Sequence, residues 1–143
     1  MVKIFFDADV IFSLCYSNNS QSGANKVIAF AHGNKIDLLT SYLVIEEVKR
    51  NLPSALLSRL GELLELFRFS IIETVDYNLF NKLADVVNEK DAHVLAAVIQ
   101  SQSNYLLTFN KRHFLTAKFK KLNLKLQVMN PKDYIEKVIF EST

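Results

Sequence analysis

The chain opens with a short apolar segment that runs directly into acidic residues. Residues 2–6 read Val-Lys-Ile-Phe-Phe, and Asp7-Ala8-Asp9 follow. An apolar run of this length, rich in strand-forming residues, is typical of a buried strand in a parallel sheet. Ligands of open α/β sheets bind at the carboxyl ends of such strands. Because a carboxylate between apolar segments is costly unless it is paired or holds a cation, Asp7 and Asp9 are candidate metal ligands.

Helix capping is the alternative explanation for these two acids. An aspartate that follows a strand often accepts a hydrogen bond from the first turn of the next helix. The pair Asp7 and Asp9 is compatible with either use. A metal site therefore requires further acids that the fold brings to the same place.

The rest of the chain alternates between strand-like and helix-like segments. Hydrophobic spacing predicts helices over 24–32, 42–51, 53–69, 77–87 and 91–101, with Pro131 opening a last one. It predicts strands over 2–6, 35–40, 70–75, 104–108 and 124–129. Residues 17–24 are polar and turn-like, and Gly33-Asn34 are expected to close the first of these helices. This alternation predicts an α/β fold with a central parallel sheet and helices on both faces.

Two of the predicted helices carry acids on or beside the apolar face. In the helix over 42–51, Glu47 falls on the flank of the apolar stripe, whereas Glu46 falls almost opposite it. Asp91 lies in the first turn of its helix, four residues before Leu95 and therefore on the same face. A boundary glutamate that pairs with a nearby cation remains an alternative for Glu47. His93 lies off the apolar stripe and is expected at the surface.

The charges are unevenly distributed along the chain. Residues 1–91 contain 9 Lys or Arg and 12 Asp or Glu, whereas residues 92–132 contain seven Lys or Arg and no Asp or Glu. An acidic part beside a basic segment suits a polyanion presented to a metal site, although a solvated lysine face gives the same pattern.

The candidate ligands Asp7, Asp9, Glu47 and Asp91 all supply oxygen atoms. Oxygen ligands without a cysteine or histidine pair favour Mg²⁺ or Mn²⁺.

Length and composition limit the possible classes of protein. The 143 residues predict one domain, residues 1–143, with half of its residues hydrophobic. Cys15 is the only cysteine, which excludes an internal disulfide and fits a reducing compartment. The sequence shows no signal-peptide pattern and no apolar run of membrane-spanning length, so we expect a cytoplasmic protein with no membrane association.

Three segments, in their order along the chain, resemble a known family. They are FFDADVIFS, SYLVIEEVKRNL and KDAHVLAAVIQSQSNYLLTFNKRHF. Together they resemble the PIN domain, and within it the toxin ribonucleases of the VapC type. The resemblance spans the chain. It implies a three-layer α/β/α sandwich, a Mg²⁺- or Mn²⁺-dependent endoribonuclease acting on RNA, a homodimer, and an antitoxin protein that blocks the acidic pocket.

The resemblance also implies roles for particular residues. Asp7, Glu47 and Asp91 match the core acids of the family, as catalytic residues and metal ligands. Asp9 stands where many members have Asn, Ser or Asp, and Asn110 where many have a fourth Asp, so both are secondary metal ligands. The missing charge at Asn110 favours one metal ion over two. Candidate substrate contacts lie at the end of the predicted strand over 104–108 and directly after it, at Thr108, Lys111, Arg112 and His113.

Two other functions compete with a nuclease. The Asp7-Ala8-Asp9 sequence also resembles the start of haloacid-dehalogenase-type phosphatases, with Asp7 as nucleophile, Asp9 as general acid and Thr40 or Ser41 in the second motif. That fold needs a late acidic pair, which residues 92–132 do not supply. The other alternative is a non-catalytic RNA-binding PIN module, which the uncharged Asn110 keeps open.

Overall fold

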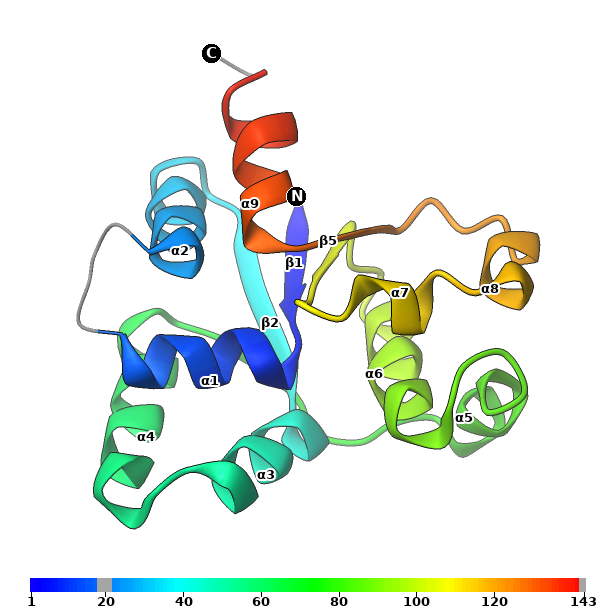
Figure 1. Ribbon diagram of the computed structural model, residues 1–143, viewed down its shortest axis with the longest axis horizontal. Helices are drawn as coiled ribbons and strands as arrows, with labels where there is room; N and C mark the ends of the chain where they lie inside the picture. The colour runs from blue at the N-terminus through cyan, green and yellow to red at the C-terminus, as the bar shows by residue number, and fades with distance from the viewer. Residues whose placement is uncertain (18–21, 142–143) are drawn as a thin grey trace.

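The computed structural model describes residues 1–17 and 22–141, so half of the predicted polar turn over 17–24, residues 18–21, lies outside the described part. A single sheet of parallel strands forms its centre (Figure 1). The strands are β1 (Lys3–Phe6), β2 (Asp37–Ser41), β3 (Ser70–Ile72), β4 (Tyr105–Leu107) and β5 (Gln127–Met129), in the spatial order β3-β2-β1-β4-β5. The predicted parallel sheet is therefore confirmed.

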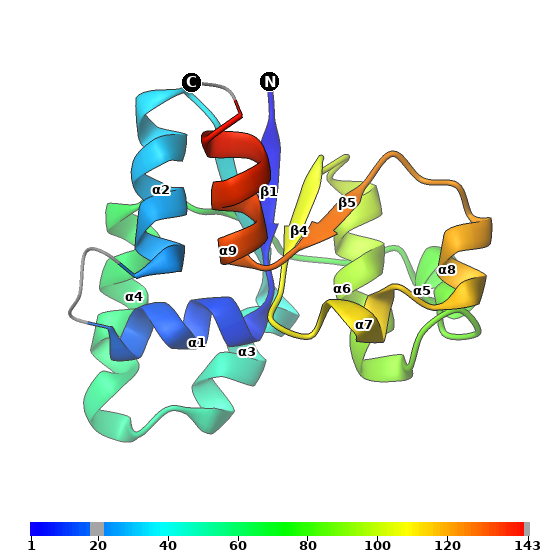
Figure 2. The same cartoon turned by 45° about the horizontal axis from the view of Figure 1, so that its top comes forward.

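Helices cover both faces of this sheet. They are α1 (Ala8–Tyr16), α2 (Gly23–Gly33), α3 (Tyr42–Asn51), α4 (Leu57–Leu66), α5 (Tyr77–Leu83), α6 (Glu89–Gln100), α7 (Lys111–Phe114), α8 (Ala117–Lys121) and α9 (Pro131–Tyr134). A 3₁₀ turn over Ser54–Leu56 precedes α4, and a π-helical turn over Ile135–Ile139 continues α9. Figures 1 and 2 show α1, α2 and α4 on one side of the central strands and α5 and α6 on the other. This arrangement is the predicted three-layer α/β/α sandwich.

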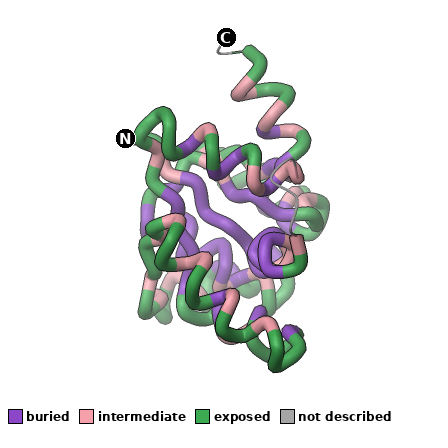
Figure 3. The backbone as a smooth tube through the Cα atoms, turned by 90° about the vertical axis from the view of Figure 1, so that its left-hand side faces the viewer, coloured by how far each residue is buried: buried purple, intermediate pink, exposed green. Residues whose placement is uncertain are grey.

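The central strand β1 is buried because both of its edges are paired. Phe5 pairs with Leu39 of β2 and with Leu106 of β4. Phe5 and Phe6 have no exposed surface, as expected for a strand that is covered on both faces. Figure 3 shows buried residues along the middle of the molecule and exposed residues on its outer turns. No helix in the described part of the chain has the length and apolar character needed to cross a bilayer.

Local hydrogen bonds explain where the helices around the site begin. Ser41 caps α3, since its hydroxyl accepts a hydrogen bond from the Val44 N–H at 3.2 Å. Asn88 caps α6 in the same way, accepting from the Asp91 N–H at 3.1 Å, so this helix begins two residues before the predicted start at Asp91. Each cap follows a strand or loop whose end lies at the carboxyl edge of the sheet. The caps thereby place the first turns of α3 and α6 at that edge.

Two segment ends show how the chain leaves its elements. Helix α2 ends at Gly33 with Asn34 as its C-cap, as predicted, and the backbone then turns at Lys35, with φ of 56°. The Ile36 N–H then donates to the Ala31 carbonyl at 3.0 Å, which completes a helix-terminating motif that usually carries glycine. The predicted strand over 70–75 ends at Ile72 because the chain leaves the sheet edge there to reach α5.

Candidate active site

Asp7 is held in place by the two elements that it joins. It follows β1 and caps α1, where its Oδ1 accepts a hydrogen bond from the Ala8 N–H at 2.8 Å. Its Oδ2 accepts a second bond from the Thr108 hydroxyl at 2.8 Å. The residue is only 8% exposed. Burial, and after it the negative charge of Asp9, raises the pKa of Asp7 from 3.8 to about 7. Asp7 thus both caps a helix and presents a buried carboxyl, so the two explanations offered for it are not exclusive.

Asp9 is fixed through one of its two carboxylate oxygens. Oδ2 accepts hydrogen bonds from the Phe109 N–H and from Asn110 Nδ2, each at 3.0 Å, and lies 3.3 Å from the Thr108 hydroxyl. Oδ1 is buried and has no hydrogen-bond partner among the described residues. Burial raises the pKa of this carboxyl despite the donors around Oδ2. The free Oδ1 is therefore an acceptor without a donor, which a bound cation would satisfy.

Asp91 and Glu47 approach the same place from two other helices. Asp91 lies in the capped first turn of α6, and its Oδ2 is buried without a hydrogen bond from any described residue. The nearest cationic group to that oxygen is His113 Nδ1, at 3.9 Å. Glu47 lies on the flank of α3, as its helical position predicts, while Glu46 pairs with Lys49 at 3.5 Å. Of the two neighbouring glutamates, only Glu47 lies beside Asp7, Asp9 and Asp91.

These carboxylates line one cavity of about 190 Å³ at the carboxyl edge of the sheet. The polar side chains in its wall are Asp7, Asp9, Glu47, Asn88, Lys90, Asp91, Asn110 and His113. The cavity is called the acidic pocket below. The fold therefore brings together all five residues that the sequence proposed as primary or secondary metal ligands. They come from α1, α3, α6 and the β4–α7 loop.

The donors in the acidic pocket suit a hydrated divalent cation. No three Asp, Glu, His or Cys side chains in residues 1–17 and 22–141 stand close enough to enclose a single ion directly. Mg²⁺ and Mn²⁺ do not need such a cage, because they keep several waters and bind through one or two carboxylates. The unpartnered oxygens Asp9 Oδ1 and Asp91 Oδ2 fit this kind of binding. Asn110 presents its amide nitrogen to Asp9, so in this arrangement it positions a carboxylate.

The four predicted substrate contacts are placed differently from one another. Thr108 is fully buried, and its hydroxyl supports Asp7 instead of facing a substrate. Lys111 pairs with Asp133 of α9. Arg112 and His113 are exposed on α7, a short helix that hydrophobic spacing did not predict. His113 lines the acidic pocket, so it is the predicted contact that lies nearest to the carboxylates.

His93 is a residue that the sequence placed wrongly at the surface. It is partly buried between α6 and α3, and its Nδ1 has no hydrogen-bond partner among the described residues. Burial lowers the pKa of the His93 ring against the opposing effect of Glu47 and Asp91. A position off the apolar stripe of α6 predicts exposure only if no other helix packs there, and here α3 does. No signal in the sequence alone reveals that contact.

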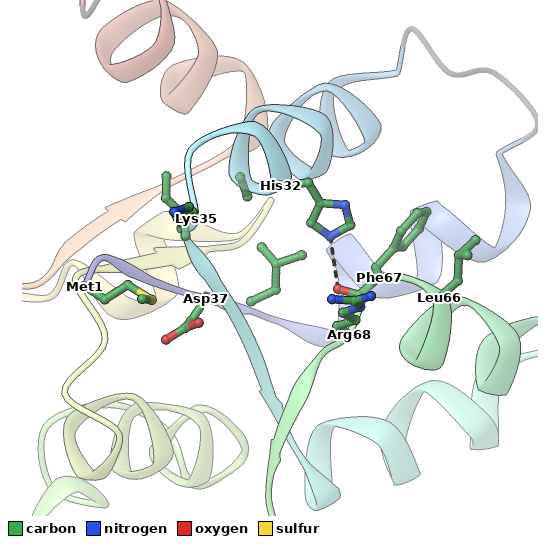
Figure 4. Close-up of a pocket in the computed structure, with 10 residues that line it drawn as sticks. Met1, His32, Lys35, Asp37, Leu66, Phe67 and Arg68 are labelled. Carbon is green, nitrogen blue, oxygen red and sulfur yellow. Dashed lines mark hydrogen bonds between the residues drawn. The ribbon is translucent and has the colours of Figure 1, made fainter.

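A second large hollow lies at the opposite, amino edge of the sheet (Figure 4). It has a volume of about 580 Å³ and contains the ends of α2 and α4. His32 of α2 contacts the carbonyl oxygen of Phe67 at 3.2 Å, the dashed line in Figure 4. Lys35 and Arg68, two cations in the wall of this cavity, follow the carboxyl ends of α2 and α4, where positive charge is favourable. Asp37 is the one acid in its wall, so the acidic pocket is the better candidate for chemistry.

Comparison with known proteins agrees with this architecture. The family model described as PIN domain matches residues 3–112 of the chain. The protein therefore belongs to the PIN domain family. Membership of this family argues against the haloacid-dehalogenase alternative, since that resemblance rested only on Asp7, Asp9 and Thr40 or Ser41.

Two solved structures share the fold at low sequence identity. One is the VapBC2 complex from Rickettsia felis bound to a DNA fragment of its promoter, with a TM-score of 0.60, 15% identity, and coverage of 89% of this chain and 98% of that one. The other is VapC20 from Mycobacterium tuberculosis, described as a toxin that cleaves the sarcin-ricin loop, with a TM-score of 0.55, 13% identity, and coverage of 85% and 97%. No curated protein sequence matches the chain.

Proposed function

We propose that this protein is a metal-dependent endoribonuclease that hydrolyses phosphodiester bonds of RNA, and that it is the cytoplasmic toxin of a VapC-type toxin–antitoxin pair. The observation that carries the proposal is the acidic pocket, in which Asp7 from the end of β1 meets Glu47 of α3 and Asp91 of α6. Two buried carboxylate oxygens in its wall lack a donor. Membership of the PIN family and the likeness to two VapC folds support the same function.

Asp7, Glu47 and Asp91 would hold a Mg²⁺ or Mn²⁺ ion, with Asp9 as a further ligand. When bound, such an ion polarises a phosphoryl oxygen and lowers the pKa of a water molecule that attacks phosphorus. The Thr108 hydroxyl and the Ala8 N–H fix the Asp7 carboxyl at the end of β1. Phe109 and Asn110 hold Asp9 through one oxygen and leave the other free.

Cations near the acidic pocket would bind the phosphates of the substrate. Lys90 and His113 line the pocket itself, and Arg112 is exposed on the neighbouring helix α7. Lys118, Lys120 and Lys121 extend the positive charge over α8. Such cations steer a polyanion to a cleft whose own side chains are acidic.

An antitoxin protein and a second copy of this chain are the partners that we propose. The two similar structures are a VapBC complex and a VapC toxin, which supports an antitoxin for this chain also. Coexpression with the product of an adjacent small open reading frame, followed by copurification, would test for the antitoxin.

Cleavage of a mixed RNA pool tests the nuclease. Wild type, Glu47→Gln and Asp91→Asn are compared in Mn²⁺, Mg²⁺ and EDTA. Cleavage should require metal and should fall about 100-fold or more in both variants, because each removes a carboxylate from the metal site. Glu46→Gln is the matched control, since Glu46 neighbours Glu47 on α3 but does not line the acidic pocket. RNA binding without cleavage, unaffected by metal, would instead identify a non-catalytic RNA-binding module.

A further inference from the structure

A second groove lies directly beside the acidic pocket. It runs over the first turns of α6, between α3 and α5, and has a volume of about 660 Å³. Its wall includes Arg50 of α3, Phe80 of α5 and His93 of α6. Glu47 and Lys90 line both this groove and the acidic pocket, so the two are neighbours with a shared wall. We call it the α3–α6 groove. Its volume lies within the range of about 300–1,000 Å³ for small-molecule sites.

The side chains of this groove combine an aromatic ring with cations. Phe80 is only partly buried, so part of its ring remains accessible. Neither Arg50 nor Lys90 forms an ion pair with a described residue. An aromatic surface beside unpaired cations is the combination that binds single-stranded nucleic acid, because bases stack on the ring and phosphates pair with the cations. Glu89 is the one acid in the wall that does not also belong to the acidic pocket.

His93 adds one directional polar group to this groove. His93 lines the groove, and its Nδ1 is buried without a partner among the described residues, so we assign the contact with a ligand to Nε2. A single nitrogen held by packing against α3 can form a hydrogen bond to the edge of a base in one geometry only. Stacking on Phe80 accepts any base, whereas a contact with His93 discriminates between bases.

We propose that the α3–α6 groove binds the nucleotide adjacent to the bond that is cut, with its base on Phe80, its phosphate near Arg50 and Lys90, and its base edge against His93. The inference rests on the proposed function, and it names a substrate subsite for that function. The geometry that supports it is the shared wall, since a nucleotide in this groove has its phosphate next to the acidic pocket.

Binding of a short fluorescent single-stranded RNA, measured by anisotropy at several salt concentrations, tests the proposal. Phe80→Leu should weaken binding about tenfold through lost stacking. Tyr42→Leu is its control, because Tyr42 is 51% exposed on α3 and lines neither the groove nor the acidic pocket; Tyr77 is unsuitable, since its ring contacts that of Phe80. Arg50→Gln should lower the dependence of log Kd on log salt by about 0.7, the value for one phosphate of a single strand. Lys49→Gln makes the same charge change one residue away, outside the groove, and should have little effect.

Mapping of cut sites in the same RNA pool tests the groove proposal separately from the proposed nuclease function. We expect His93→Gln to change which bases flank the cuts, and Phe80→Leu to weaken binding without changing them, with unfolding temperatures near that of wild type. If wild type cuts RNA but the groove variants match their controls in affinity and cut sites, the groove proposal is wrong and the nuclease stands. If RNA is bound but never cut, and the groove variants weaken binding, the groove stands and the nuclease is wrong. If wild type neither binds nor cuts RNA, both are overturned.

Discussion

Replacing Asp7 with asparagine should stabilise the metal-free protein while it abolishes cleavage. The carboxyl of Asp7 is buried and lies near Asp9 and Glu47, and these surroundings raise its pKa from 3.8 to about 7. Ionisation is therefore less favourable in the folded chain than in the unfolded chain. Because the folded pKa is the higher one, this group lowers stability as the pH rises from about 4 to above 7.

The size of the effect follows from the two pKa values. At pH 8 the wild-type carboxyl costs the metal-free fold about 4 kcal/mol, and at pH 5 about 2 kcal/mol. An amide at this position has no charge to bury, so the gain from Asp7→Asn should follow the same pH dependence. Metal binding should make the wild type the more stable of the two proteins, since a cation stabilises its charged carboxylate.

The local hydrogen bonds can accept the amide. Asparagine is as good a helix cap as aspartate, so its oxygen can accept from the Ala8 N–H. Its nitrogen would donate to the Thr108 hydroxyl, which now lies 2.8 Å from Asp7 Oδ2. The hydroxyl hydrogen can then turn to Asp9 Oδ2, at 3.3 Å. The Ala8 N–H and the Thr108 hydroxyl therefore both keep hydrogen-bond partners in the variant.

Urea denaturation in EDTA at pH 5, 6.5 and 8 measures the prediction. The free energy of unfolding of Asp7→Asn should exceed that of wild type most at pH 8, and Mn²⁺ should stabilise only the wild type. Asp85→Asn, at an exposed aspartate, is the control for loss of one charge. Equal stability of wild type and Asp7→Asn at pH 8, or a gain that does not vary with pH, would refute the argument that burial makes this charge costly.

Three further changes have defined outcomes. Asn110→Asp removes the 3.0 Å bond to Asp9 and adds a carboxylate, so it should lower metal-free stability by about 1–2 kcal/mol and tighten Mn²⁺ binding in calorimetry. Tyr134→Phe removes a buried hydroxyl that has no partner among the described residues, so denaturation should show no loss and up to about 1 kcal/mol of gain. Gln102→Gly relieves a φ of 57° after α6 and should add about 0.5–1 kcal/mol, whereas Gln102→Ala should not.

The sequence was a good guide wherever local periodicity decides the structure. The buried strand before Asp7, the end of α2 at Gly33 and the inward position of Glu47 all follow from spacing within a few residues, and the structure has them. The helix α1 was expected only through the capping alternative for Asp7 and Asp9, without bounds. Spacing did not reveal that Lys35 takes the conformation usual for glycine.

Contacts between distant segments account for the rest of what was missed. The hydroxyl of Thr108 reaches Asp7 across 101 residues of sequence, and Asn110 reaches Asp9 across the same separation. A single sequence gives no measure of such pairing, so Thr108 was predicted to face a substrate. His93 was misplaced for the same reason, since its burial depends on how α3 packs against α6.

The strand order also sets the time at which the site can form during synthesis. The ribosome delivers β1 first, together with β2 and β3 within the first 72 residues, but the other neighbour of β1 is β4, which begins at Tyr105. At about 5–20 residues per second, one edge of β1 stays open for about 5–20 s after β1 itself is made. Throughout that interval Asp7 lacks the Thr108 hydroxyl and Asp9 lacks its donors, so the nascent chain carries an unfinished site. Any activity of the acidic pocket therefore begins only after most of the chain has left the ribosome.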